Sequence, residues 1–133
     1  LEENDILFNR SNSPELVGKA SIFRGYNTPI IFAGYLVRVT VNTQMILPEY
    51  LNSILNSNYG IRLNNKNVSI SGNQANINAT KLKSYPIPLP DISTQSKIVK
   101  KLNQEREIID ANKKLIQIYK DKVGDRINKI WGK

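Results

Sequence analysis

The chain has 133 residues, enough for about one domain, and carries a formal net charge of +8. It contains neither cysteine nor histidine, which excludes disulfides, thiolate metal sites and the commonest general base. No apolar run approaches the length of a membrane span and no signal peptide is visible, so we expect a cytoplasmic protein without a membrane partner. Because the first residue is Leu1 and not Met, we expect a fragment or a processed chain.

The positive charge is spread over the whole chain. Residues 1–90 hold eight Lys/Arg and five Asp/Glu, whereas residues 91–133 hold eleven and six. An excess of cations attracts phosphate and makes such binding sensitive to salt. A basic surface that serves only solubility explains the same charge. Charge alone therefore does not locate a binding face.

The first forty residues predict a compact antiparallel β unit. Short apolar or alternating segments bounded by turn residues are typical of strands, and we expect strands over residues 5–9, 17–23, 30–33 and 35–41. In the last of these, a tyrosine or valine occupies every second position from Tyr35 to Val41, which is the period of a strand. Residues 10–14 have the composition of a turn.

The hydrophobic period then changes from two to that of a helix. Residues 47–56 predict a short helix packed on the sheet, and Pro48 and Glu49 suit its first turn. Residues 61–72 are polar and basic and have no strong period. A solvated loop is the simple interpretation. The functional alternative is a loop whose amides and cations reach base edges and phosphates.

The next segment leads towards the C-terminal third of the chain. Residues 74–82 predict a short strand followed by a turn of helix with Asn78 as its N-cap. Prolines alternate with other residues over 85–90, so this segment is extended and forms an edge strand or a stiff connector. Ser93 is the expected N-cap of the helix that follows.

The last third of the chain predicts one long amphipathic helix. No proline interrupts residues 94–131, which gives a length of about 57 Å. Apolar residues recur there at every seventh position, and we name this set the stripe: Leu102, Ile109, Ile116, Val123 and Ile130. A helix of this length cannot bury its own stripe, so we expect these residues to pack against a partner surface.

The stripe does not have the composition of a simple two-stranded zipper. The positions three residues after its first four members are mostly polar, namely Glu105, Asn112, Tyr119 and Arg126. Neighbouring apolar residues widen it instead: Ile98, Val99, Ile108, Leu115 and Ile127. This pattern suits packing against more than one helix, or against a helix and a domain. The predicted fold class is α+β, with a small antiparallel β-rich domain carrying short helices, followed by one long C-terminal helix.

Several blocks of the sequence together resemble a known family. They are Asp-Ile-Leu-Phe-Asn-Arg-Ser-Asn-Ser at 5–13, Val-Gly-Lys at 17–19, Pro-Ile-Ile-Phe-Ala-Gly-Tyr-Leu-Val-Arg at 29–38, Gln-Ala-Asn-Ile-Asn-Ala at 74–79, Leu-Lys at 82–83, Pro-Ile-Pro-Leu-Pro at 86–90, and Gln95 with Ile98-Val99. In this order they resemble the target recognition domain of type I restriction–modification specificity subunits. The resemblance covers nearly the whole chain.

The resemblance implies a division of labour between two parts of the chain. Residues 1–90 would form a DNA recognition domain that lacks its N-terminal part, and residues 91–133 a helix for spacing and dimerisation. Such subunits carry two recognition domains, each reading half of a split sequence in double-stranded DNA, and their long helices pair antiparallel. This chain holds one such unit, so the second would come from a homodimer or from the other half of a longer chain.

The resemblance also implies a partner that carries the chemistry. Methylation subunits dock on the framework and bring S-adenosylmethionine, so no cofactor is expected on this chain. The sequence itself shows neither the Asn/Asp-Pro-Pro-aromatic loop of an amino-methyltransferase nor a Walker motif, so we expect no catalytic and no metal-binding residue. An assembly protein that works only through its helix, and an enzyme in its own right, are the alternatives.

Sequence readout should come from residues that the family's motifs do not fix. Arg24 and Asn27 lie in one predicted turn, and a second group lies in the polar run of residues 61–72. With two further polar residues, the candidate DNA-binding set is Lys19, Arg24, Asn27, Arg62, Asn64, Asn65, Lys66, Asn67 and Gln74. Capping and loop hydrogen bonds explain Gln74, Asn76 and Asn78 equally well. We expect Asp5 and Arg10, at a strand–turn boundary, to pair with each other structurally, and contact with DNA is the alternative.

Overall fold

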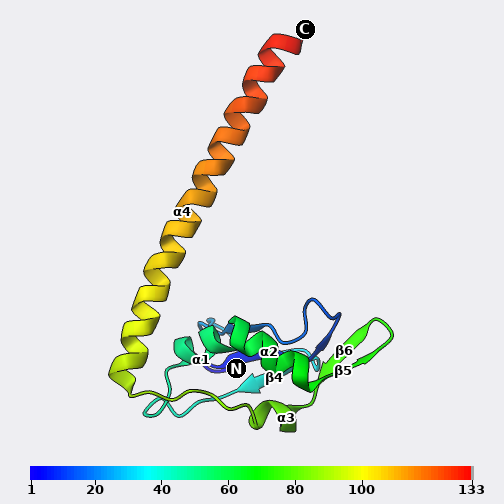
Figure 1. Cartoon of the computed structure of the whole chain (residues 1–133), viewed down its shortest axis with the longest axis vertical. Helices are drawn as coiled ribbons and strands as arrows, with labels where there is room; N and C mark the ends of the chain where they lie inside the picture. Colours follow the sequence, from blue (N-terminus) through cyan, green and yellow to red (C-terminus); the bar gives the residue numbers. More distant parts are fainter. Residues whose placement is uncertain (133) are drawn as a thin grey trace. The chain divides into compact units, whose positions relative to one another are not determined.

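The computed structural model describes residues 1–132 and divides the chain into two compact units (Figure 1). The first unit is Leu1–Lys97 and the second begins at Ile98. Small antiparallel sheets and short helices make up the first, and the second is helical. The predicted α+β class with a long C-terminal helix is confirmed. Within residues 1–132 no helix combines the length and the apolar character needed to cross a membrane.

The first sheet is antiparallel, with its three strands in the order β3-β1-β4. Its strands are β1 (Ile6–Asn9), β3 (Ala20–Ile22) and β4 (Leu36–Val39). Ile6 and Phe8 of the central strand are fully buried, and Ile6 pairs with Ile22 on one side and with Val39 on the other. The predicted buried strand at 5–9 is confirmed because its alternating apolar residues face the core.

The other predicted strands are shorter than expected or absent. Gly18 has a φ of +86°, a conformation outside the strand region, and β3 starts only after it. No strand forms over 30–33, so that prediction is wrong; Ile31 is 93% exposed and contributes nothing to a core. The predicted turn at 10–14 contains instead a two-residue strand, β2 (Ser11–Asn12).

A second antiparallel sheet has the strand order β2-β6-β5. It adds β5 (Val68–Ser71) and β6 (Gln74–Ile77). The predicted loop over 61–72 is therefore wrong, because α2 (Asn58–Asn67) and β5 occupy it. The side chain of Ser57 caps α2 by accepting a hydrogen bond from Gly60 N, a local signal for the start of a helix.

The core lies where helices and both sheets meet. Helix α1 (Pro48–Leu55) buries Leu51 and Leu55 against Ile6 and Phe8, as the sequence predicted, with Pro48 and Glu49 in its first turn. Leu63 of α2 and Ile77 of β6 complete the contact between the sheets. The short helix α3 (Ala79–Lys83) begins after Asn78, whose side chain accepts a 2.8 Å hydrogen bond from Thr80 N. The predicted N-cap is thus confirmed.

Residues 85–90 form an extended connector and no strand. Two tyrosine hydroxyls from the helices hold it: Tyr50 donates to the carbonyl of Pro88 and Tyr59 to that of Pro86. Of the two alternatives for this segment, the connector is the one that forms.

The long helix α4 runs over Ile92–Trp131, drawn from yellow to red in Figure 1. Its N-cap is Asp91 and not Ser93 as predicted. The carboxylate of Asp91 accepts hydrogen bonds from Thr94 N at 2.9 Å and from Thr94 Oγ1 at 2.8 Å. These bonds lower the pKa of Asp91. The first turn of α4 belongs to the first compact unit, which ends at Lys97.

Candidate nucleic-acid interface

Helix α2 separates its polar residues into an inner and an outer set. Asn64 is 7% exposed; its amide donates to Gly18 O at 3.3 Å and its carbonyl accepts from the Tyr85 hydroxyl at 3.0 Å. The side-chain amide of Asn67 donates a hydrogen bond to the carbonyl of Leu63 at 2.8 Å. Because these amides are engaged within the fold, they are poorly placed to meet an external ligand.

The outer set consists of Arg62, Asn65 and Lys66, all exposed, and we call it the α2 face. Asn65 and Lys66 follow Arg62 by three and four positions, so both lie on the same side of the helix as Arg62. The guanidinium carbon of Arg62 is 5.9 Å from the ring centroid of Tyr59. Since the hydroxyl of Tyr59 is bound to Pro86 O, the ring is a fixed platform under this cation.

A cleft of about 490 Å³ brings Lys19 together with Asn65. Gly18 lets the two segments approach, because a Cβ there would fall 2.2 Å from the Asn64 amide nitrogen. Asn56 forms part of the wall and is fixed by two bonds with Ala20, whose N donates to Oδ1 at 3.1 Å and whose O accepts from Nδ2 at 2.9 Å. The apolar part of the lining includes Val17, Leu55, Ile61, Val68 and Ile70.

The remaining candidates occupy other parts of the first unit. Arg24 is engaged with α1: its Nη1 lies 2.8 Å from Glu49 Oε1 and donates to Asn4 Oδ1 at 3.1 Å. Burial acts to raise the pKa of Glu49, but the hydrogen bond from Arg24, a backbone hydrogen bond and the charge of Arg24 together outweigh burial, and the pKa is lowered. Asn27 is exposed in the segment after β3, and Gln74 is exposed at the start of β6. Their contact with DNA stays a prediction.

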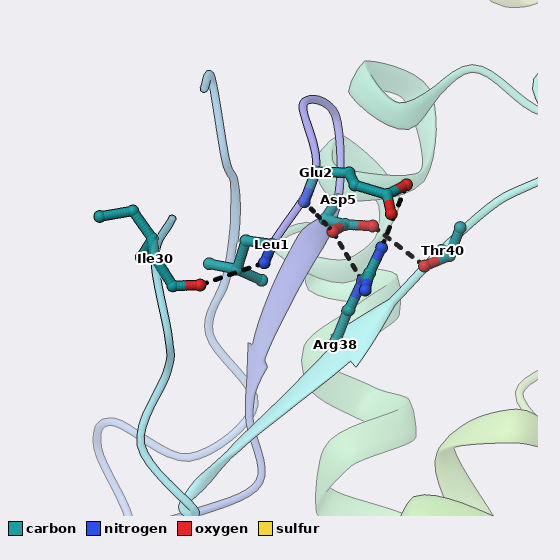
Figure 2. A network of polar contacts seen from close by, with 6 residues as sticks. All are labelled: Leu1, Glu2, Asp5, Ile30, Arg38 and Thr40. Carbon is teal, nitrogen blue, oxygen red and sulfur yellow. Dashed lines mark hydrogen bonds and ion pairs between the residues drawn. The ribbon is translucent and has the colours of Figure 1, made fainter. Parts of the chain in front are cut away.

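A network around Asp5, drawn in Figure 2, was not visible in the sequence. Nε of Arg38 lies 2.6 Å from Asp5 Oδ2, and Thr40 Oγ1 donates to Asp5 Oδ1 at 2.9 Å. Glu2 N also donates to Asp5, at 2.7 Å. The expected pairing of Asp5 with Arg10 is therefore wrong, because Arg38 on the neighbouring strand holds the carboxylate. Nearby, the nitrogen of Leu1 donates to the carbonyl of Ile30 at 3.1 Å.

The electrostatics of Asp5 follow from these contacts. Burial of its carboxylate acts to raise the pKa of Asp5, but hydrogen bonds from Glu2, Arg38 and Thr40 outweigh burial, and the pKa lies below its ordinary value. The same contact raises the pKa of Arg38. The pair is ionised at neutral pH and fixes β4 to the start of β1.

The stripe of α4 is exposed along its whole length. Leu102 is 37% exposed and Ile130 is 70% exposed, and Ile109, Ile116 and Val123 lie between these values. An apolar surface of this extent marks an interaction site in soluble proteins. Its packing against a partner stays a prediction.

Within residues 1–132 no group of three or more His, Cys, Asp or Glu is arranged to hold a metal ion. The carboxylates described above are engaged with arginines or cap a helix. The arrangement presents cations, amides and an apolar helical surface, which are the groups of a binding module.

The described residues thus comprise a unit of small sheets and short helices, followed along the chain by a long helix with an exposed apolar stripe. The chain belongs to the family of type I restriction modification DNA specificity domains, which it matches over residues 1–119.

Two relatives are both longer than this chain. It is 30% identical over 134 residues to the "Putative type I restriction enzyme MjaX specificity subunit" of Methanocaldococcus jannaschii, covering 97% of this chain and 30% of that protein. It is 29% identical over 105 residues to the type I restriction enzyme StySPI specificity subunit of Salmonella potsdam, covering 78% of this chain and 23% of that protein. The chain thus spans less than a third of the length of either relative.

Proposed function

We propose that the chain is the recognition unit of a type I restriction–modification system and reads one half of a split sequence in double-stranded DNA. Its family and the specificity subunits among its relatives support this role. The observation that carries the proposal is the division of α2. Asn64 holds the helix to Gly18 and Asn67 bonds to a carbonyl of its own helix, whereas the α2 face presents two cations and an amide to solvent.

The chemistry of the α2 face suits DNA. Arginine and lysine bind phosphates and guanine, and asparagine binds adenine through a bidentate contact. Arg62 rests on Tyr59, so less side-chain entropy is lost when it meets the duplex. Lys19 and Asn65 share a cleft beside this face and extend the polar surface.

Helix α4 supplies the second part of the function. Its 40 residues make a rod of about 60 Å. The exposed stripe packs against the corresponding helix of a second recognition unit, supplied by another copy or by the rest of a longer protein. The distance between the two half-sites then follows from the length of the paired helices.

The methylation subunit of the same system supplies the chemistry. It binds S-adenosylmethionine, docks on the assembled recognition units and methylates the sequence that they select. In this scheme the chain decides which sequence is modified and performs no step of the reaction itself.

Selection of duplexes from a randomised pool tests this function. The chain is assembled with its methylation subunit, and bound DNA is sequenced after several rounds. We expect one short sequence to be enriched at a fixed distance from a second, with an affinity that falls as salt rises. Equal affinity for every duplex would contradict the proposal and leave the chain an assembly protein.

A further inference from the structure

Arg10 differs from the other three arginines in residues 1–97. Arg24 and Arg38 form ion pairs with carboxylates, and Arg62 lies over the ring of Tyr59. Within the described residues, the side chain of Arg10 makes no hydrogen bond and no ion pair, and its Nε is shielded from solvent. A partly desolvated guanidinium without an acceptor costs free energy, so its position calls for a ligand.

The backbone of Arg10 is held firmly. The residue lies between the end of β1 at Asn9 and the start of β2 at Ser11, where the chain passes from one sheet to the other. Its N donates to Tyr35 O at 3.0 Å, and its O accepts from Ile77 N at 2.8 Å. The base of the side chain is thus anchored in both sheets while its charged end has no partner. This is the arrangement of a preorganised binding residue.

We propose that Arg10 binds a phosphate of the DNA backbone; the assignment rests on the proposed function. Nε of Arg10 is shielded from solvent and unpaired, as is Oδ1 of the neighbouring Asn9, while the Arg10 residue as a whole is only half-buried. An oxyanion that reaches the terminal nitrogens can also meet Nε–H after a small shift of the side chain, in the bidentate geometry that guanidinium forms with phosphate. The net positive charge of the chain favours a DNA phosphodiester over an isolated carboxylate as the ligand of Arg10.

This role predicts a contact that positions the protein without reading a base. A phosphate contact contributes equally to every sequence, and its loss lowers the salt dependence of binding by about one unit in the log–log slope. The affinity for target and non-target duplexes should fall together, by about tenfold each. A residue that reads a base would instead change the preference between them.

The test compares Arg10→Gln with Lys100→Gln in the complex with the methylation subunit. Lys100 is an exposed residue of α4. Its substitution removes the same charge at a side chain that is not shielded from solvent as Nε of Arg10 is. Affinity is measured over a range of salt for a selected duplex and an unrelated one. We expect Arg10→Gln to weaken both and to flatten the salt dependence, with smaller changes for Lys100→Gln. An unchanged slope for Arg10→Gln would overturn the assignment.

Two further measurements distinguish a phosphate contact from other roles. Arg10→Gln breaks no bond within the fold, so its melting temperature should equal or exceed that of the wild type; a marked fall would make Arg10 a structural residue and overturn the assignment. If Arg10→Gln weakened assembly with the methylation subunit in the absence of DNA, the ligand of Arg10 would be a protein carboxylate, and the assignment to a phosphate would be overturned. A wild-type complex without sequence preference would contradict the proposed function, whereas an unchanged salt slope in a selective complex contradicts only the role of Arg10.

Discussion

Asp5 immediately precedes β1 and Arg38 lies in the neighbouring strand β4, with Nε of the arginine 2.6 Å from Oδ2 of the aspartate (Figure 2). The side chain of Asp5 is 2% exposed and that of Arg38 is 34% exposed, so the carboxylate is inside the fold and the cation reaches solvent. Thr40 and the backbone of Glu2 occupy the other acceptor positions of Asp5. The carboxylate is thus satisfied on all sides and fixes the pairing of β1 with β4.

This pair predicts a dependence of stability on pH. Because the pKa of Asp5 is lowered in the folded protein, its ionised form contributes stability that is present above its unfolded pKa of about 3.9 and is lost as pH falls further. Asp5→Asn should therefore destabilise the protein clearly at pH 7 and much less at pH 3. Urea unfolding of both proteins at pH 7 and at pH 3 measures this difference, with Glu3→Gln, at an exposed residue, as control. A difference that stays constant with pH would contradict the account.

Two neighbouring asparagines of α2 should respond differently to the same substitution. Asn64→Ala removes the acceptor of the Tyr85 hydroxyl and the donor to Gly18 O, so we expect a loss of about 2 kcal/mol in the free energy of unfolding. Asn65→Ala, on the exposed α2 face, should leave stability within about 0.5 kcal/mol and change the affinity or the preference for DNA. Denaturant unfolding and binding to selected duplexes measure the two effects. The same loss of stability in both variants would contradict the division of α2.

Much of the fold was predictable because its signals are local. Apolar alternation marks β1, Pro48 and Glu49 mark the start of α1, and Asn78 caps α3. Helix α2 was missed because its run of asparagines has low helix propensity. The fact that offsets this propensity, the burial of Asn64 between Gly18 and Tyr85, depends on segments far away in the sequence.

The candidate site was predictable only in part, for the same reason. The sequence offers several polar residues in one run and cannot show which of them turn inward. It placed Lys19 and Asn65 in one set without showing that they share a cleft. The sequence suggested Arg10 as the partner of Asp5. Only the pairing of β1 with β4 brings Arg38 to the carboxylate instead. Asp91 and Ser93 are both good caps, so the start of α4 was ambiguous by one or two residues.

Gln95 should be essential for the first unit. Its side chain is fully buried, accepts from Leu47 N at 2.9 Å and donates to Met45 O at 3.0 Å and to Pro90 O at 2.7 Å. Gln95→Ala leaves these backbone groups without partners and should cost about 2–3 kcal/mol of unfolding free energy. Gln104→Ala, at an exposed position of the same helix, is the matched control and should cost little. Equal effects would show that the contacts of Gln95 do not stabilise the unit.

The stripe of α4 predicts an effect on assembly. Ile116 is 56% exposed, and Ile116→Asp would place a charge in the middle of the paired helices. We expect the dissociation constant of the dimer, or of the complex between recognition units, to rise by at least about tenfold. Ala111→Asp introduces the same charge about 140° around the helix, outside the stripe, and should have a small effect. Light scattering over a range of concentrations measures both; an oligomer that survives Ile116→Asp unchanged would contradict the role of the stripe.

Selection of a DNA sequence by this chain for a methylation subunit is measured by the affinity of the assembled complex for its selected duplex. That duplex is compared with one in which a single half-site has been scrambled, at low and at high salt. We expect weaker binding to the scrambled duplex at both salt concentrations, weaker binding of both duplexes at high salt, and a loss of affinity when Arg62 and Lys66 are replaced by glutamine. Equal affinity for the two duplexes, unaffected by these substitutions, would contradict sequence selection by this chain.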